Sequence, residues 1–193
     1  MRLNISPIRN LFLAAAVIAG SSGAGPAAAE EVYMVRGFAN VFSRGMDQMT
    51  RQLRARGIRA RSMSNGEWQA VAQDIIRRSK QGRVSHPIII AGHSLGGVEA
   101  PNFANALGSA GVTVALVIGL DPGFPVPNSF GSGIRHVVNY KIPSGQDYRR
   151  GRGFTGRMET IDVSRYGVDH VGIDKHPGVQ KLVINRIRRR VGK

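Results

Sequence analysis

The sequence lacks cysteine altogether. This absence excludes disulfide scaffolds, thiol catalysis, iron–sulfur clusters and zinc sites built from cysteine, and it excludes a lipoprotein anchor on that residue. Acidic residues are scarce, because 12 Asp and Glu stand against 27 Lys and Arg and give a formal net charge of +15. Aromatic residues make up only 6% of the chain. The hydrophobic fraction of 42% is nevertheless that of a globular protein, so the composition argues against wholesale disorder.

The sequence also has no hydrophobic run of the roughly 20 residues that a membrane-spanning helix needs. The apolar stretch at residues 11–20 is about half that length. Arg2 and Arg9 precede it, and small residues that end in the alanines 27–29 follow it. This order is typical of a cleavable export signal with an A-x-A site. We therefore predict that residues 1–29 are a signal peptide and that the mature protein is secreted or periplasmic.

Residues 30–193 are long enough for a single domain with one substantial core. Short β-rich runs alternate with helical patterns, which is typical of a parallel α/β sheet. The expected strands are 32–36, 58–63, 87–91, 112–120, 135–142 and a short edge strand at 159–164. The expected helices are 46–56, a segment with an apolar stripe from Trp68 to Ile76, 97–107 and 179–189. This order predicts a three-layer α/β/α sandwich with a mostly parallel sheet of about five or six strands, and a long surface loop at 144–158.

The most informative segment joins the third expected strand to the helix that follows it. Residues 87–97 read PIIIAGHSLGG and contain a G-x-S-x-G motif centred on Ser94. The continuous apolar run predicts a strand that is covered on both faces. A sharp turn from such a strand into a helix exposes the serine hydroxyl at the carboxyl edge of the sheet, and it leaves no room for side chains at Gly92 and Gly96. The segment therefore has the setting that a serine nucleophile requires.

The hexapeptide GHSLGG, residues 92–97, resembles the nucleophile elbow of the lipase and esterase branch of the α/β-hydrolase superfamily. Strand order and motif spacing extend this resemblance over most of residues 30–193. The chain looks like a minimal member without a lid domain, because no helical insertion follows the fifth expected strand. The resemblance implies a Ser-His-Asp triad in the chain order nucleophile, acid, histidine, with the last two downstream of Ser94.

Two aspartates are candidates for the acid of this triad. Asp121 follows the strand that ends in Ile118-Gly119-Leu120, a place similar to that of the acid in pancreatic-type lipases. Asp147 lies one strand later, which is the commoner location in the superfamily. A turn-capping role is the structural alternative for Asp121. We prefer Asp121 as the acid and keep Asp147 as the alternative.

Five histidines compete for the role of the base. His86 and His136 lie where strands begin, at the opposite edge of a parallel sheet from the nucleophile, and His93 is expected to point away from the hydroxyl of its neighbour. His176 precedes a proline and is expected to cap the last helix. His170 lies in the loop before that helix, where the histidine of the superfamily is expected. We therefore predict His170 as the base.

Two N–H donors are needed to stabilise the oxyanion of acyl transfer. The resemblance implies Leu95, the residue after the nucleophile, as one donor. It places the other in the loop Arg36-Gly37-Phe38-Ala39 after the first strand, where we expect Phe38. Many family members have His-Gly where this chain has Arg36-Gly37, and the substitution is expected to bring a positive charge near the pocket.

These residues predict an exported serine hydrolase that cleaves small acyl esters or lipids through an acyl-enzyme. The missing lid and the few aromatic residues favour short or medium acyl chains. The same triad serves thioesters and amides, so a thioesterase or an amidase is one alternative. A catalytically silent hydrolase fold that binds anionic surfaces is the alternative outside the enzyme class.

The excess of positive charge predicts attraction to anionic surfaces such as lipid headgroups or cell-wall polymers. Arginines cluster at two places, namely Arg149, Arg150, Arg152 and Arg157 in the long loop and Arg186, Arg188, Arg189 and Arg190 in the last helix. A solvated basic face explains the clusters equally well. Nucleic-acid binding is not expected, because the chain has no recognition motif and few aromatics for stacking. The histidines have no metal-ligand spacing, so we expect no cofactor and no metal, and we expect a monomer.

Overall fold

A computed structural model of the chain describes residues 30–38 and 43–193. The predicted signal peptide lies outside these residues. Six strands form one sheet in the order β2-β1-β3-β4-β5-β6, and every neighbouring pair is parallel. The strands are β1 (Glu31–Val35), β2 (Ala60–Met63), β3 (Ile88–His93), β4 (Val114–Leu120), β5 (His136–Lys141) and β6 (Arg157–Asp162).

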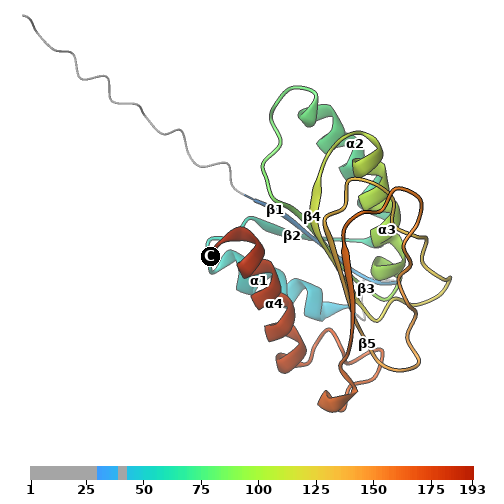
Figure 1. Cartoon of the computed structure of the whole chain (residues 1–193). Coiled ribbons are helices and arrows are strands. Elements are labelled where there is room, and N and C mark those ends of the chain that lie inside the picture. Colours follow the sequence, from blue (N-terminus) through green and yellow to red (C-terminus); the bar gives the residue numbers. More distant parts are fainter. Residues whose placement is uncertain (1–29, 39–42) are drawn as a thin grey trace, which may run out of the picture.

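Helices cover both faces of the sheet (Figure 1). The helices α1 (Arg44–Arg54) and α4 (Pro177–Val191) pack on one face, and α2 (Trp68–Ser79) and α3 (Leu95–Ser109) pack on the other. Two short 3₁₀ helices, η1 (Asn65–Glu67) and η2 (Ser164–Tyr166), lie in connecting segments. The three-layer α/β/α architecture predicted from the sequence is confirmed.

Two apolar cores form because alternate residues of a strand point to opposite faces of the sheet. In β1, Val32 and Met34 pack toward α1 and α4, whereas Tyr33 and Val35 pack toward α2 and α3. The central strand β3 is buried along its whole length, as the run PIIIA predicts. Because β3 and β4 are held on both faces, the loops at their carboxyl ends start from fixed positions.

The segment 144–158 differs from the expected surface loop. Tyr148 and Phe154 are buried, and the ring of Phe130 packs against both of them. The Tyr148 hydroxyl donates to the carbonyl oxygen of Gly97 in α3 at 2.7 Å. The segment is therefore part of the second core, even though its many Gly and Arg residues are typical of a solvated loop. Within the part of the chain that the structure describes, no helix is both long and apolar enough to cross a membrane.

Candidate active site

The turn between β3 and α3 consists of a single residue, Ser94, with φ 54° and ψ −121°. Its N–H donates to the carbonyl of Leu120 at the end of β4 at 3.1 Å. A Cβ at Gly92 would lie within 3.0 Å of the carbonyl oxygen of Gly96, and a Cβ at Gly96 would lie equally close to that of Val35. Both glycines are therefore required by close backbone approach, as the G-x-S-x-G motif predicts.

Ser94, His170 and Asp121 form a continuous chain of hydrogen bonds. Ser94 Oγ lies 2.9 Å from His170 Nε2, and His170 Nδ1 lies 2.6 Å from Asp121 Oδ2. The three residues come from the β3–α3 turn, the end of β4 and the loop before α4. Within residues 30–38 and 43–193, Ser94 and Asp121 are the non-glycine residues with positive φ. Such strained backbone clusters at functional sites, because the surrounding structure must hold it in place.

The carboxylate of Asp121 is buried and held from two sides. Its Oδ1 accepts a hydrogen bond from the N–H of Ile142 at 3.3 Å, while Oδ2 contacts His170. The backbone at Gly145 covers it so closely that a Cβ there would collide with Oδ1. The alternative acid, Asp147, is exposed and pairs instead with Lys141 Nζ at 2.9 Å. The structure thus brings Asp121, and not Asp147, to the histidine.

The imidazole of His170 is 42% exposed, so it is open to solvent and to a substrate. Its hydrogen bond to Asp121 raises the pKa of His170 above the ordinary value of 6.5, against the opposing effect of partial burial. In the neutral ring Nδ1–H donates to the carboxylate, which leaves the lone pair of Nε2 directed at Ser94 Oγ. This tautomer is the one that can accept the serine proton.

His93 does not contact the Ser94 hydroxyl and takes part in a second, buried network. Its Nε2–H donates to the carbonyl oxygen of His170 at 2.8 Å, since a carbonyl can only accept. Its Nδ1 then accepts from the Ser43 hydroxyl at 2.9 Å, and Ser43 Oγ in turn accepts from the N–H of Gly37 at 2.8 Å. Burial lowers the pKa of His93 to about 4, so this ring is neutral at pH 7.

This relay connects the three segments around Ser94: the loop after β1, the elbow itself and the loop of His170. We call it the Ser43–His93 relay. No sequence pattern predicts this relay, because Ser43 and His93 are 50 residues apart and no spacing rule links them. The sequence does contain one sign of such a network. His93 directly precedes the nucleophile on a buried strand, and a buried imidazole requires hydrogen-bond partners.

The aspartates next to His170 in the sequence have other partners. Asp169 Oδ1 accepts from the N–H of Gly172 at 2.6 Å and so closes its own loop. Asp174 is fully buried beside the first turn of α1 and lies 4.0 Å from His93 Nδ1. Burial raises the pKa of Asp174 to about 6. Neither side chain competes with Asp121 for the imidazole of His170.

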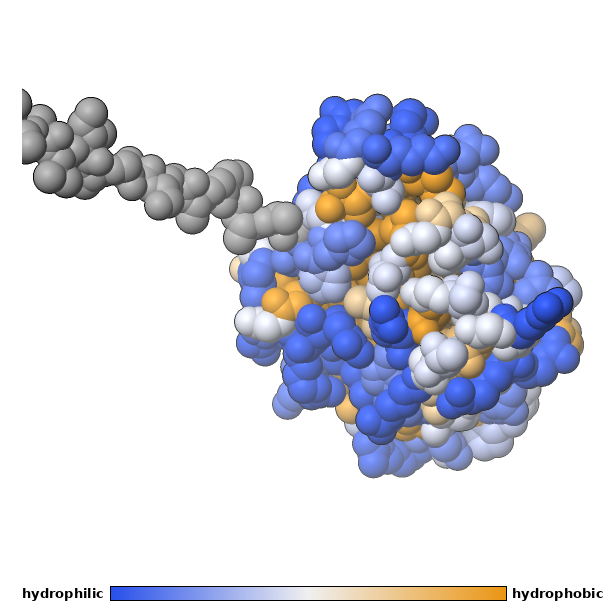
Figure 2. Space-filling view, turned by 45° about the horizontal axis from the view of Figure 1, so that its top comes forward, coloured by the Kyte–Doolittle hydropathy of each residue, from blue (hydrophilic) through white to orange (hydrophobic). Residues whose placement is uncertain are grey.

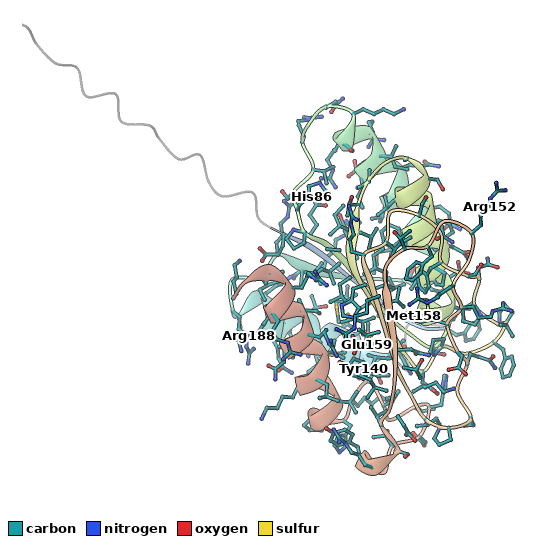
Figure 3. The ribbon with its side chains drawn as sticks, viewed as in Figure 1. His86, Tyr140, Arg152, Met158, Glu159 and Arg188 are labelled. Carbon is teal, nitrogen blue, oxygen red and sulfur yellow. The ribbon has the colours of Figure 1, made fainter. Side chains whose placement is uncertain are left out.

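The remaining histidines lie where the sequence predicts. His86 is exposed at the amino end of the sheet, far from the elbow (Figure 3). His136 begins β5 and bonds to Glu159 of β6. His176 caps α4, because its Nδ1 accepts from the N–H of Gly178 at 3.1 Å.

The predicted oxyanion donors belong to segments next to Ser94. Leu95 is the first residue of α3, so its N–H has no partner in the helix ladder. A Cβ at Gly37 would lie 3.0 Å from Ser94 Cβ, so the loop that continues into Phe38 passes close to the nucleophile. The N–H of Gly37 is already bonded to Ser43, whereas residues 39–42 lie outside the described residues. The positive charge expected near the pocket is paired, because Arg36 contacts Asp47 at 3.2 Å.

Exposed apolar side chains surround this end of the molecule. Phe38, Phe124, Val126 and Val171 are 72%, 79%, 49% and 43% exposed. Phe38 follows β1, Phe124 and Val126 follow β4, and Val171 follows His170, so all four lie in loops at the carboxyl end of the sheet. We call these four residues the apolar rim. Within the described residues, no group of three or more His, Asp or Glu side chains is placed to hold a metal ion.

No protein-family model and no curated protein matches the sequence. The fold is nevertheless similar to solved structures. Est1E from Butyrivibrio proteoclasticus matches with a TM-score of 0.56 and 14% identity over 87% of this chain and 90% of that one. The NocB thioesterase domain, in covalent complex with a fluorophosphonate nocardicin G analog, matches with a TM-score of 0.52 and 12% identity over 83% of this chain and 94% of that one. At these identities the similarity shows a shared fold, the α/β-hydrolase fold.

Proposed function

We propose that the protein is a serine hydrolase that cleaves carboxylic esters through an acyl-enzyme. The observation that carries the proposal is the unbroken contact from Ser94 Oγ through His170 to the buried carboxylate of Asp121. Each of the three side chains has the chemistry that its position requires, namely a nucleophile, a base and an acid that orients the base. The fold shared with Est1E and with a thioesterase domain supports hydrolysis as the class of reaction.

In the first step His170 Nε2 accepts the proton of Ser94 as Oγ attacks the acyl carbon. The imidazolium that forms is stabilised by Asp121, which remains ionised. The oxyanion receives hydrogen bonds from the N–H of Leu95 and, in this proposal, from that of Phe38. His170 then donates its proton to the leaving alkoxide, which departs as an alcohol and leaves Ser94 acylated.

In the second step water attacks the acyl-enzyme. His170 accepts a proton from the water, and the tetrahedral intermediate collapses by breaking the bond to Ser94 Oγ. The proton returns to Oγ, and the products are a carboxylic acid and the free enzyme. The open position of His170, which is 42% exposed, gives water access to the ester bond.

The apolar rim supports an acyl group as the recognised part of the substrate. Exposed Phe and Val side chains gather where an acyl chain bound to Ser94 would leave the site, and burying them against such a chain is favourable. We infer that short and medium acyl chains bind best, because the rim has no deep cover. In a p-nitrophenyl ester series, kcat/KM should rise from acetate to a medium chain and fall for long chains. A value of kcat/KM that is highest for the longest acyl chain of the series would contradict this inference.

A thioester is the second candidate for the scissile bond. The NocB match is a thioesterase domain, and the exposed residues of the apolar rim are Phe and Val side chains, which do not select oxygen over sulfur. Assays on an alkyl ester and a thioester with the same acyl group separate the two candidates. The bond with the higher kcat/KM identifies the substrate class.

The direct test of the proposal compares the protein with Ser94→Ala on p-nitrophenyl butyrate. The proposal predicts that kcat/KM falls roughly 10³- to 10⁶-fold in Ser94→Ala. The activity that remains comes from substrate binding and from the uncatalysed reaction. Ser109→Ala is the matched control, because it removes an exposed hydroxyl at the end of α3 and leaves the site intact. Full activity in Ser94→Ala would overturn the proposal.

We further propose that the chain is exported and cleaved after Ala29. Support comes from the residue that cleavage would expose, because the carboxylate of Glu30 accepts hydrogen bonds from Lys193 Nζ at 2.8 Å and the N–H of Arg59 at 3.1 Å. The fold therefore holds the chain firmly at the predicted boundary. Amino-terminal sequencing of the protein secreted or released from the periplasm should read Glu-Glu-Val-Tyr.

A further inference from the structure

A second concave site lies at the amino end of the strands, opposite the end that carries Ser94. It is a cavity of about 830 Å³ between β1, β2 and the second half of α2. Six arginines line it: Arg54, Arg59, Arg61, Arg77, Arg78 and Arg83. Figure 2 turns the top of the view in Figure 1 toward the viewer and shows hydrophilic residues around a central band of apolar and intermediate ones. The cavity is large enough for a small ligand, since such sites typically measure about 300–1,000 Å³.

Strand alternation explains why these side chains gather. Arg61 of the edge strand pairs in register with Tyr33, so it projects on the same face as Glu31 and Tyr33, and Arg59, which directly precedes the strand, also lines the cavity. That face is packed with apolar residues at its carboxyl end, where Met63 and Val35 lie in the core beneath α2. At the amino end polar side chains replace the apolar ones, and a basic cavity takes the place of the core.

The two carboxylates in the cavity are already paired. Glu31 accepts two hydrogen bonds from the Arg78 guanidinium, at 2.7 and 2.9 Å, and further ones from the Tyr33 hydroxyl and the N–H of Ser85. Asp74 contacts Arg78 at 2.7 Å and Arg77 at 2.6 Å. These bonds fix the walls of the cavity. They leave six positive charges against two negative ones, an excess that only an anion can balance.

Four of the arginines, Arg54, Arg59, Arg61 and Arg83, have no carboxylate partner among the described residues. Arg59 and Arg61, at the start of the edge strand β2, are both exposed. The guanidinium of Arg61 lies 5.0 Å from the centre of the Tyr33 ring, which orients it and leaves its N–H groups free to donate. Arg54 is also oriented, because its Nε donates to the carbonyl of Ala60 at 2.6 Å. The guanidinium groups of Arg54, Arg61, Arg77 and Arg78 are thus held in place before any ligand arrives.

We propose that this cavity binds a small molecule with two or more phosphate groups. The planar fork of a guanidinium matches the spacing of phosphate oxygens, and several such forks around one hollow favour a multiply charged anion over a single carboxylate. An excess of four positive charges matches a di- or triphosphate. The site lies at the far end of the sheet from Ser94, so its occupation does not require the hydrolase chemistry.

The test is a titration of the protein with inorganic tripolyphosphate by calorimetry at a fixed ionic strength of about 0.15 M, at which exposed charges are largely screened. The proposal predicts saturable binding to one site with a Kd on the order of 10 μM, and at least about tenfold weaker binding of sulfate at the same ionic strength. The double variant Arg59→Gln/Arg61→Gln should weaken tripolyphosphate binding by at least tenfold. Absence of saturable binding, or equal affinity for sulfate, would overturn the proposal.

The matched control is Arg152→Gln/Arg189→Gln, which removes the same charge from two exposed side chains outside the cavity. Figure 3 shows Arg152 projecting away from the molecule, at a distance from the amino end of β1. The control should bind tripolyphosphate within about twofold of the unmodified protein. If both double variants weaken binding equally, the attraction comes from net charge and the cavity is not a site.

Folding of the variants is checked by circular dichroism and by hydrolysis of p-nitrophenyl butyrate, which the cavity variants should retain. If Arg59→Gln/Arg61→Gln does not fold, Arg83→Gln takes its place, because its side chain bonds only to the nearby exposed Gln81. This variant should weaken binding about threefold. A protein inactive on esters that still binds tripolyphosphate would contradict the proposed function alone, whereas the reverse result would contradict only this inference.

Discussion

At the scale of single residues, the site depends on two side chains held on unusual backbone. Ser94 and Asp121 have φ values of 54° and 44°, which side-chain-bearing residues rarely adopt. Each backbone is held by the next strand of the sheet, since Ser94 N–H donates to Leu120 of β4 and Asp121 N–H donates to Tyr140 of β5. The strain places the hydroxyl and the carboxylate on opposite sides of one imidazole.

Asp121→Asn is expected to lower kcat/KM on p-nitrophenyl butyrate by roughly 10³- to 10⁴-fold, because the amide no longer holds the Nδ1–H tautomer of His170. Asp147→Asn should stay within about twofold, since Asp147 is an exposed partner of Lys141. Steady-state kinetics on both variants check this prediction. A severe loss in Asp147→Asn alone would assign the acid to the other aspartate.

The pH dependence should report the same contact. The hydrogen bond to Asp121 raises the pKa of His170, and only the neutral imidazole accepts the serine proton. The acid limb of kcat/KM should therefore lie above pH 6.5, with activity rising as pH rises through it. In Asp121→Asn the residual activity should show this limb at lower pH. A limb that does not move would show that the titrating group is not His170.

The Ser43–His93 relay makes His93 a positioning residue. His93→Phe leaves the buried Ser43 hydroxyl and the His170 carbonyl without partners, so kcat should fall on the order of 10- to 100-fold while KM stays within a factor of about two. His93→Gln should recover part of the loss, because its amide can donate to one group and accept from the other. His86→Gln, an exposed histidine at the other end of the sheet, is the control.

The three triad residues could be predicted from the sequence. The buried residues that hold them in place could not. The elbow, the strand-end aspartate and the histidine before the last helix follow from spacing and chain order. Ser43 and Asp174 meet His93 only through the packing of α1 against the loop before α4, which no local pattern records. Long-range contacts of buried polar groups require the fold itself.

At the scale of elements, the loop after β5 holds the acid in place. Gly145 closes over Asp121 where no side chain fits. Gly145→Ala would push a methyl group into the carboxylate, so kcat/KM should fall at least tenfold while the fold persists. Gly131→Ala is the control, because its added Cβ would meet only ordinary contacts of 3.5 Å or more. Steady-state kinetics and thermal unfolding of both variants distinguish the site effect from a general loss of stability.

The elements themselves were predictable because their apolar periodicity is strong. All six strands were expected, and their boundaries shift by a few residues, as with β6, which begins at Arg157 instead of Glu159. The buried ring of Tyr148 was not expected, because it lies in a segment rich in Gly and Arg. Its ring packs directly against Gly119 in β4, where any side chain would collide with it. Only the fold brings these two residues together.

At the scale of the whole molecule, the two ends of the sheet differ in chemistry. The carboxyl end has an apolar rim around Ser94, whereas the amino end has the arginine-lined cavity. Basic clusters in the long loop and in α4 are evident from the sequence, but this one is not. Its arginines are spread over residues 54–83, and they gather only because β2 is placed beside β1 under α2.

Glu31 should make stability depend on pH. Burial alone would raise the pKa of this carboxyl, but the hydrogen bonds from Arg78 and Tyr33 outweigh it and lower the pKa to about 2. The stability that Glu31 contributes is present above its ordinary pKa of 4.5 and is lost as pH falls toward 2. Glu31→Gln should therefore cost up to about 3 kcal/mol at pH 7 and much less at pH 3.

Urea unfolding of Glu31→Gln at both pH values measures this difference. Asp147→Asn, which breaks an exposed pair, should change the free energy of unfolding by less than about 1 kcal/mol at either pH. An equal cost of Glu31→Gln at pH 7 and pH 3 would show that the carboxylate charge is not what stabilises the fold.

The central claim is that Ser94 is a nucleophile activated by His170, and covalent labelling tests it most directly. The protein is incubated with a fluorophosphonate probe, digested, and the modified peptide is identified by mass spectrometry. The account predicts one probe per chain on Ser94, no labelling of Ser94→Ala, and labelling of His170→Ala slower by orders of magnitude. A folded protein that stays unlabelled, or that carries the probe on another residue, would contradict it.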